Sequence, residues 1–449
     1  MNTASTGALA GSSGKVGLLI NRNYGLLFAG QTISLIGDQV STYTLLLWIV
    51  TIILPGRSWA PLAISALMVA EMTPSLLVGP IAGVFVDRWN RRLTMLNMDA
   101  IRAVLMTLLL AFTGIVPLPF LAHGQISPWL QLGAIITVAC LASVCAQFFG
   151  PSYIGLVAEI VPKQHRPQAV GLGQTMTSLA SIIGPPLAAP LLFSVGIQWA
   201  LIIDILSYVV SLLTLWAIQS PAVTPPLSTH SNMRSEFVEG LHFSFSNQVV
   251  RMLIITSCII ALGSGAFGSL YIFFVQQNLH ADVKFAGFIG AFLGAGTIVG
   301  ALFASKFSNS VGAKRMLYGS LMLSGLSIVV LSRLTSFTPA LVIIFLFGFM
   351  LAALRVVVAP LMLKETPTNM IGRVVSVMNP MTTIVILLST PFTGYLAAVV
   401  LVNFHFHFNW LLNMTFGPID TIFVGVGCTF FLAALYTYYA FARNKDSET

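Results

Sequence analysis

Long apolar segments separated by short polar joints recur along the whole chain, and this pattern constrains its fold more than any other feature. Only 8% of the 449 residues are charged, whereas 57% are hydrophobic. A water-soluble domain carries roughly 25% charged residues, and an apolar run of about 18 residues or more can span a bilayer. The sequence therefore predicts an all-α membrane protein with little chain left for a separate soluble domain.

Twelve membrane-spanning helices are predicted, and polar joints that contain Pro and Gly, such as Leu54-Pro55-Gly56-Arg57, separate them. The predicted helices cover residues 24–53, 60–86, 93–114, 128–158, 169–195, 198–219, 251–277, 284–306, 314–333, 338–363, 373–401 and 416–441.

The longest stretch without an apolar run, residues 220–250, divides the chain into two halves of six helices. Within it Phe237, Leu241, Phe245 and Val249 recur every four residues, which predicts an interfacial helix lying along the membrane. The predicted organisation is a disordered cytoplasmic tail (1–20), an N-terminal six-helix bundle (21–219), a cytoplasmic linker with the interfacial helix (220–250), a C-terminal six-helix bundle (251–442) and a cytoplasmic tail (443–449).

The distribution of basic residues predicts the orientation in the membrane. When the chain is threaded with its start in the cytoplasm, most of the 21 Lys and Arg residues fall on the cytoplasmic side. The positive-inside rule then places both termini in the cytoplasm of a multi-pass protein of the cell membrane. The same basic residues form short clusters between apolar segments and no single basic face, so a nucleic-acid partner is not expected.

Several kinds of site are not expected. The four cysteines, Cys140, Cys145, Cys258 and Cys428, all fall inside apolar segments and have neither disulfide nor metal-ligand spacing. The two histidines of the loop at residues 404–408 are too few for a metal site. We find no motif of a metalloprotease, serine hydrolase or phosphate-binding loop, so no cofactor, metal or enzymatic activity is predicted.

The two halves of the chain repeat each other weakly. Glu159-Ile160-Val161-Pro162 resembles Glu365-Thr366-Pro367, and Pro186 corresponds to Pro391 at the same offset. Paired halves suit alternating access, in which one half rocks against the other around a site near the membrane midplane.

The sharpest local motif is Gly83-Val84-Phe85-Val86-Asp87-Arg88-Trp89-Asn90-Arg91-Arg92, between the second and third predicted helices. We expect Gly83 to allow a close helix approach and Asp87 to end a helix before a basic loop. The motif resembles the loop signature of the major facilitator superfamily, Gly-x-x-x-Asp-Arg-x-x-Arg/Lys-Arg/Lys.

The resemblance implies a conformational lock. In that family the aspartate of this loop pairs with the second half and holds the outward-open state, and Arg373 lies where the partner is expected. The alternative for Arg88, Arg91 and Arg92 is that they only hold the loop in the cytoplasm.

The fifth predicted helix carries Gly171 and then Gly184-Pro185. This spacing resembles the antiporter motif of exporters in the superfamily, although Ala180, Ala188 and Ala189 stand where that motif has glycines. Ordinary packing of small residues is the alternative. The opening Asn21-Arg22-Asn23-Tyr24-Gly25 resembles the branch that holds macrolide and siderophore exporters, and with the loop motif the resemblance covers essentially the whole chain.

Six ionisable residues lie inside predicted spans: Asp38, Glu71, Asp99, Arg102, Asp204 and Arg355. Each costs roughly 2.5–3.5 kcal/mol at a helix centre, so each needs a partner, water or a function. Asp99 and Arg102, three residues apart, are expected to form a structural ion pair. Asp204, beside Tyr208, is expected to be a hydrogen-bonded packing residue.

Asp38 and Glu71 are the candidates for proton coupling, because each lies mid-helix with no basic neighbour in sequence. Burial in an apolar cavity favours the neutral form of a carboxyl group, so protonation can compete with substrate binding. In the alternative interpretation, Arg355 neutralises one of these acids. Arg355 could also bind an anionic substrate, and we include all three residues in the predicted substrate cavity.

Together these features predict a secondary active transporter, a proton-coupled exporter of amphipathic small molecules such as drugs or macrolides that works by alternating access. The alternatives are a siderophore exporter and a lysophospholipid flippase on the same fold. Protons, a small-molecule substrate and membrane lipid are the expected partners, and the resemblance implies a monomer.

Overall fold

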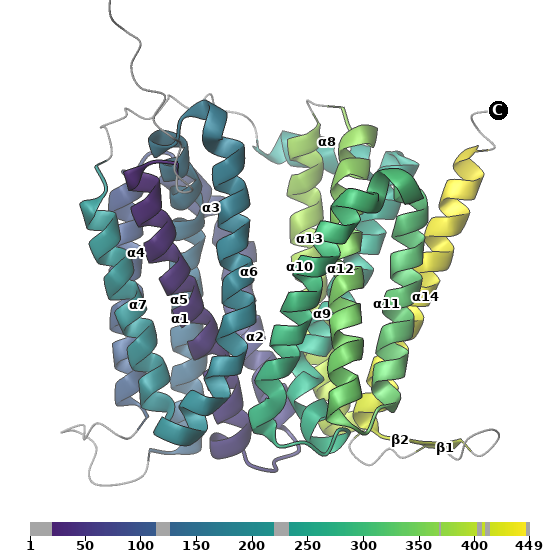
Figure 1. Cartoon of the computed structure of the whole chain (residues 1–449), viewed down its shortest axis with the longest axis horizontal. Coiled ribbons are helices and arrows are strands. Elements are labelled where there is room, and N and C mark those ends of the chain that lie inside the picture. The colour runs from purple at the N-terminus through teal and green to yellow at the C-terminus, as the bar shows by residue number, and fades with distance from the viewer. Residues whose placement is uncertain are drawn as a thin grey trace, which may run out of the picture.

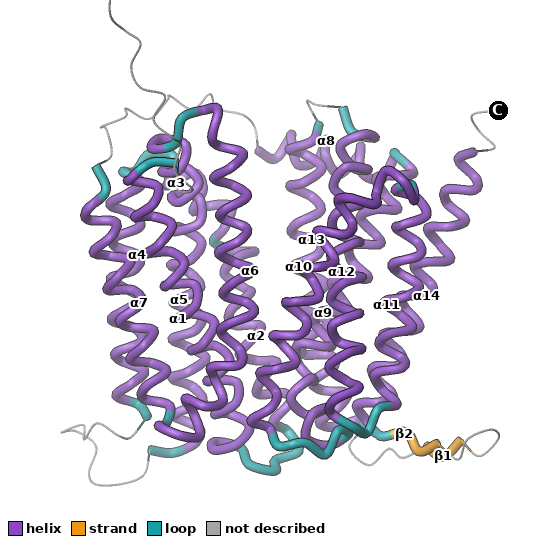
Figure 2. The backbone as a smooth tube through the Cα atoms, viewed as in Figure 1, coloured by secondary structure: helices purple, strands orange, loops and turns teal. Residues whose placement is uncertain are grey.

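The computed structural model describes residues 20–113, 126–219, 233–367, 370–401, 406–408 and 414–445. Almost all of this chain is helical (Figure 2), and twelve of its helices are long and apolar enough to cross a membrane. Each of the twelve predicted spans overlaps one of them, which confirms the predicted fold class. The predicted tail at 1–20 and the start of the linker, residues 220–232, lie almost entirely outside the described residues.

The first half contains the helices up to the linker. They are α1 (Arg22–Trp48, extended by a π-helical turn Ile49–Ile53), α2 (Ala60–Leu77), α3 (Gly79–Val86), α4 (Arg91–Ala111), α5 (Pro128–Ile160), α6 (Arg166–Pro190, with a 3-10 turn Lys163–His165 before it and a π-helical turn Leu191–Val195 after it) and α7 (Ile197–Ala217).

The second half begins with the linker helix α8. Its elements are α8 (Met233–Ser246), α9 (Gln248–Gln277), a 3-10 turn Val283–Phe285, α10 (Ala286–Val311), α11 (Ala313–Arg333), α12 (Phe337–Glu365), α13 (Ile371–Tyr395, extended by a π-helical turn Leu396–Val400), β1 (Phe406–Phe408), β2 (Met414–Phe416) and α14 (Pro418–Lys445). The antiparallel pair β1–β2 was not predicted. Helix α14 also runs past the predicted boundary at 442, so the first residues assigned to the C-terminal tail are helical.

The helices form two bundles that repeat the same packing (Figure 1). In the first bundle α1 contacts α6 and α7, α4 contacts α5 and α7, and α2 contacts α5. In the second, α9 contacts α13 and α14, α11 contacts α12 and α14, and α10 contacts α12. Contacts between the bundles are paired in the same way, α6 with α10 and α13 with α2. The weak sequence repeat therefore corresponds to a repeated arrangement of six helices.

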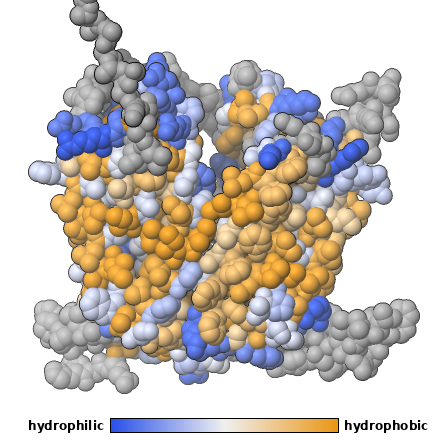
Figure 3. Space-filling view, viewed as in Figure 1, coloured by the Kyte–Doolittle hydropathy of each residue, from blue (hydrophilic) through white to orange (hydrophobic). Residues whose placement is uncertain are grey.

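The start of α1 and the end of α14 lie at the same face of the molecule, at the top of Figure 1. We call this the terminal face and the other the opposite face. An apolar belt surrounds the middle of the molecule, and polar side chains gather near the two faces (Figure 3). The same view shows the surface hollowed between the two bundles at the terminal face.

The bundles touch each other near the opposite face. Gly287 of α10 lies so close to the backbone carbonyl of Pro185 on α6 that any Cβ atom there would overlap it. The Ser65 hydroxyl of α2 lies 3.0 Å from the Thr390 carbonyl of α13 and 2.8 Å from the Pro61 carbonyl of its own helix, so the two carbonyls share one donor. The rings of Tyr43 on α1 and Tyr271 on α9 meet edge-on, with centroids 6.4 Å apart. The molecule is thus closed at the opposite face and open at the terminal face.

We expect Ser65→Ala to weaken this closure. The substitution removes the hydroxyl that Thr390 shares with Pro61, so the loss between the bundles is at most about 1 kcal/mol. Because the contact with Thr390 exists only while the opposite face is closed, its loss should raise the population of the conformation open at that face, relative to the closed one, by up to about fivefold. Electron-spin distance measurements between labels at Ser58 and Gln277 would detect the change. Ser75→Ala on the same helix, whose hydroxyl bonds only to the Met72 carbonyl, is the control and should leave the distances unchanged.

Candidate functional site

A polar pocket of about 210 Å³ lies inside the first bundle, between α1, α2, α4, α5 and α7. Asp38 of α1, Glu71 of α2, Arg102 of α4 and Tyr208 of α7 line it together with apolar side chains such as Val138 of α5. Four of these five helices contribute a titratable side chain. The pocket therefore brings Asp38 and Glu71 together, but Arg355, the third residue of the predicted substrate cavity, does not line it.

The Asp38 carboxylate is held by the tyrosine that faces it. The Tyr208 hydroxyl donates a hydrogen bond to Asp38 Oδ1. The Arg102 guanidinium lies over the Tyr208 ring, 5.9 Å from its centroid, and over the Phe149 ring at 5.2 Å. Guanidinium groups are attracted to the faces of aromatic rings, so the two rings hold Arg102 at the wall of the pocket.

Asp204 lies one turn from Tyr208 on α7 and is completely buried. Its Oδ2 accepts a hydrogen bond from the Ser41 hydroxyl of α1 at 2.7 Å, and the Ser207 hydroxyl approaches Oδ1 at 3.4 Å. This arrangement is the hydrogen-bonded packing that the sequence analysis expected of Asp204.

Asp99 of α4 has a closer partner than the arginine predicted to pair with it. Arg102 Nη1 lies 3.7 Å from Asp99 Oδ1, whereas the Ser211 hydroxyl of α7 donates to Asp99 Oδ2 at 2.6 Å. The Gln31 amide of α1 in turn donates to Ser211 Oγ at 2.9 Å. Asp99 Oδ1 is buried and has no hydrogen bond from the residues that the structure describes.

Two glycines allow α1 to lie close enough to α7 for these contacts. A Cβ atom at Gly37 would overlap the Ser207 side chain and come within 2.9 Å of Asp204 Oδ1. A Cβ atom at Gly30 would overlap Thr214. Small residues permit such close helix approach in membranes. The seven-residue spacing of the two glycines puts both on the face of α1 that meets α7.

Away from the helix ends, the described spans of the first bundle hold four acids and one base. The acids are Asp38, Glu71, Asp99 and Asp204, and the base is Arg102. An isolated charge in an apolar interior is costly, and a carboxyl group there becomes neutral by binding a proton. One guanidinium balances one carboxylate, so the remaining acids are groups that can hold protons.

Arg355 does not neutralise these acids, contrary to the alternative raised from the sequence. It lies on α12 in the other bundle, is exposed, and is not among the residues that line the pocket. Arg102 is the basic residue there. The sequence could not show whether Arg355 or Arg102 faces these acids, because it does not reveal which helix faces meet. Arg102 was expected to pair with Asp99 on its own helix.

A second, mostly apolar pocket of about 550 Å³ lies toward the terminal face between α1, α5 and α6. Its polar wall includes Gln31, Tyr153, Arg166 and Gln174, and its apolar wall includes Phe149. Arg166 Nη2 donates to the Ala158 carbonyl at 2.6 Å. Pockets of this volume, apolar with few polar groups, bind drug-sized molecules.

The structure gives the loop motif a different local role from the one predicted. A Cβ atom at Gly83 would meet nothing within 4 Å, so the expected close helix approach there is wrong for this conformation. Asp87 and Arg88 are exposed at the terminal face, where the bundles stand apart. Arg91 pairs with Glu159 of α5 at 2.6 Å, and Arg92 Nε donates to the Leu215 carbonyl at the end of α7. Through these contacts the two arginines bind the loop to helices of its own bundle.

Arg373, the predicted partner of Asp87, contacts the linker helix instead. Its guanidinium lies 2.8 Å from the Glu239 carboxylate of α8. Gly240 lies so close to Arg373 that a Cβ atom there would come within 2.9 Å of both its carbonyl carbon and its Cβ. Phe237 and Leu241 on the same helix are 42% and 37% exposed, as an interfacial helix requires. In this conformation the second bundle therefore holds Arg373 against α8.

Part of the antiporter-like motif lies in close contacts between helices. A Cβ atom at Gly184 would overlap Gln39 of α1, and Pro185 meets Gly287 and Gly290 of α10 across the two bundles. A Cβ atom at Gly171 would meet nothing within 4 Å. Gly184 and Pro185 therefore contribute to close packing at the opposite face, whereas Gly171 does not.

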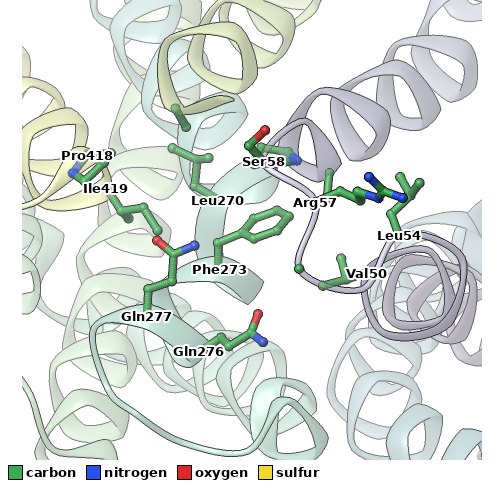
Figure 4. Close-up of a pocket in the computed structure, with 14 residues that line it drawn as sticks. Val50, Leu54, Arg57, Ser58, Leu270, Phe273, Gln276, Gln277, Pro418 and Ile419 are labelled. Atoms are coloured by element: carbon green, nitrogen blue, oxygen red, sulfur yellow. The ribbon is translucent and has the colours of Figure 1, made fainter. Parts of the chain in front are cut away.

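A third pocket, of about 310 Å³, opens near the opposite face and is lined by both bundles (Figure 4). Arg57 and Ser58 come from the loop after α1, and Gln277 lies at the end of α9. Phe273 of α9 points toward that loop from the other bundle (Figure 4). Because its walls belong to different bundles, this pocket must change shape if the bundles move.

Sequence reasoning missed Gln31, Ser41 and Ser211, although a signal for them existed. On α7 the polar residues Asp204, Ser207, Tyr208 and Ser211 follow the spacing i, i+3, i+4, i+7, and on α1 Gln31, Ser34, Asp38 and Ser41 also share one face. Such a stripe on an otherwise apolar span indicates a buried polar contact with another helix.

Comparisons with known proteins agree on one family. A family model described as the Major Facilitator Superfamily matches residues 27–390. Macrolide efflux protein A of Streptococcus pyogenes is 21% identical over 306 residues, which cover 68% of this chain and 71% of that protein. The enterobactin exporter EntS of Escherichia coli O1:K1 / APEC is 22% identical over 303 residues, 68% of each chain.

A solved structure shows the same fold. The crystal structure of a bacterial homologue of the iron transporter ferroportin, in an inward-facing state, matches with a TM-score of 0.69 and 15% identity. The match covers 94% of this chain and 98% of that one.

Proposed function

Since this chain belongs to the Major Facilitator Superfamily and is a transporter rather than an enzyme, we propose that it exports amphipathic small molecules, such as drugs or macrolides, in exchange for protons. The observation that carries the proposal is the excess of acids inside the first bundle: Asp38, Glu71, Asp99 and Asp204 against Arg102. Acids that one base cannot balance must bind protons in the membrane. A transporter can use such protons as its driving ion.

Asp38 is the main coupling residue in this proposal, and Glu71 is the second. Both line the polar pocket and both are partly exposed, so water and protons can reach them. Arg102 and the Tyr208 hydroxyl face Asp38 and stabilise its ionised form after the proton leaves. Asp204, by contrast, is fully buried behind Ser41.

The substrate binds in the larger pocket between α1, α5 and α6. Its apolar wall suits the body of an amphipathic molecule, and Gln31 and Gln174 offer hydrogen bonds to polar groups. Arg355 of α12 does not line this pocket, so in this proposal its exposed guanidinium meets the acidic group of an anionic substrate outside it.

The transporter works by alternating access. We take the terminal face as cytoplasmic, so that the described conformation is open inward. The two units that move against each other are the bundles of residues 21–219 and 251–442. When the cytoplasmic side closes, Asp87 approaches the start of α13. Arg373 then exchanges its ion pair with Glu239 for one with Asp87. This exchange makes Asp87 the lock of the outward-open state.

Siderophore export is the second candidate, favoured by the likeness to an enterobactin exporter. A flippase of lysophospholipid on the same fold is a third possibility that one transport assay can test together with the others.

The test is transport in liposomes with an imposed pH gradient. Ethidium, a macrolide and a fluorescent lysolipid are offered separately to the purified protein. Export of ethidium or the macrolide that stops when an ionophore abolishes the gradient is the expected result. Lysolipid movement that is indifferent to the gradient, with no movement of ethidium or the macrolide, would contradict the proposal.

A further inference from the structure

A series of buried polar side chains runs between the substrate pocket and the polar pocket. Gln31 lines the substrate pocket and donates to Ser211, which donates to Asp99. Asp99 Oδ1 is 3.7 Å from Arg102 Nη1, and Arg102 lines the polar pocket beside Asp38. We call Gln31, Ser211, Asp99 and Arg102 the relay.

The relay is buried inside the first bundle. Gln31 is 5% exposed, Ser211 and Asp99 are completely buried, and Arg102 is 8% exposed. In a low-dielectric interior a hydrogen bond is strong, and members of a network depend on one another. We therefore expect the position of each relay residue to depend on that of its neighbours.

The loosest contact in the relay lies between Asp99 and Arg102. Asp99 Oδ1 has no hydrogen bond from the described residues, although the guanidinium is near. On its other side Arg102 rests on the Tyr208 ring, whose hydroxyl bonds to Asp38. The guanidinium thus interacts with both carboxylates, and a movement of its side chain would bring it closer to one or the other.

The charged and titratable groups that surround Arg102 come from four other helices and from its own. They are Asp38 of α1, Glu71 of α2, Asp99 of α4, Cys145 of α5, and Asp204 and Tyr208 of α7.

We infer that Gln31, Ser211 and Asp99 are positioning residues that set the place of Arg102 and so link substrate occupancy of one pocket to proton release from Asp38 in the other. The inference rests on the proposed function. A substrate that hydrogen-bonds to the Gln31 side-chain amide turns this amide away from Ser211, which then loses its hydrogen-bond donor. The Ser211–Asp99 contact then loosens, Asp99 holds Arg102 less firmly, and the guanidinium moves toward Asp38.

The direction of the effect follows from electrostatics. A cation that approaches a carboxyl group favours its ionised form, so Asp38 releases its proton when substrate binds. The coupling is reciprocal, because protonation of Asp38 then weakens substrate binding by the same factor. Competition of this kind is what antiport requires.

The experiment measures protons released when the purified full-length protein binds ethidium, a permanently charged dye that cannot itself release a proton. Protein in detergent is titrated in weakly buffered solution with a pH indicator, and dye fluorescence reports binding. Wild type is expected to release protons on binding. Ser211→Ala should bind the dye with a similar Kd and lose most of the proton release, and Ser211→Thr, which keeps the hydroxyl, should restore it.

Ser152→Ala is the matched control. Ser152 is also completely buried, but its hydroxyl bonds only to the Phe148 carbonyl of its own helix, so this variant should release protons as wild type does. If Ser211→Ala does not remain monodisperse, the isosteric Asp99→Asn replaces it and should show the same loss.

The outcomes separate the inference from the proposed function. If Ser211→Ala or Asp99→Asn releases as many protons as wild type, the inferred role of the relay is wrong. The proposal of proton antiport is then unaffected. A wild-type protein that binds ethidium and releases no proton, or that does not bind it at all, contradicts the proposed function and removes the basis of the relay.

Discussion

Asp38→Asn is expected to abolish proton-driven transport while leaving substrate exchange intact. A gradient of two pH units is worth ~2.7 kcal/mol per proton, which can support about 100-fold accumulation of a substrate. Asparagine keeps the shape of the side chain and its contact with Tyr208 but cannot bind and release the proton. Accumulation should therefore fall about 100-fold, to the level of liposomes without protein, whereas exchange of labelled for unlabelled substrate continues.

Asp282→Asn is the matched control for this experiment. Asp282 lies outside the spans, more than half exposed and paired with Lys284 at 2.9 Å, so the same chemical change there should leave accumulation unchanged. Accumulation by Asp38→Asn at the wild-type level would show that another group carries the proton. Glu71→Gln then becomes the variant to examine.

Arg102→Leu should destabilise the protein more than any other single substitution considered for the first bundle. Arg102 is 8% exposed and is the base among the acids of that interior. Removing one partner of a buried charge pair typically costs about 3–5 kcal/mol, because the other charge is left uncompensated. The free energy of unfolding in detergent, from denaturant titration at neutral pH, is the measurement.

The pH dependence of the stability lost by Arg102→Leu distinguishes the contribution of the Arg102 charge from that of its packing. Protonation neutralises the acids, so the destabilisation by Arg102→Leu should shrink as the pH falls. The double variant with Asp99→Asn should recover part of the stability at neutral pH. A loss that is equally large at low and neutral pH would mean that Arg102 stabilises the bundle only through its contacts with the Phe149 and Tyr208 rings.

The spans could be predicted from the sequence because the membrane imposes a simple rule. Backbone groups in lipid must bond within a helix, and a helix must be long and apolar to cross. That rule placed the helix from Gln248 to Gln277 within a few residues of its observed ends. The strands β1 and β2 lie in a loop between spans, where the rule gives no information.

The candidate site was only partly predictable, because hydropathy does not reveal which helix faces meet. Asp38 and Glu71 stood out as acids in apolar segments, and the structure places both at one pocket. Their basic neighbour was sought in Arg355, whereas the packing of α4 against α7 supplies Arg102. Arg373 was assigned to Asp87 from the family resemblance, whereas in the described conformation it pairs with Glu239 of α8.

The most direct test of proton antiport is to let the substrate drive the protons. Liposomes that contain the protein are loaded with ethidium at equal pH on both sides, with valinomycin and potassium to clamp the membrane potential. As the dye leaves, we predict that the lumen acidifies, and that Asp38→Asn removes this acidification. Dye efflux through the wild-type protein with no change of luminal pH would show that the acids of the first bundle are not exchanged for substrate.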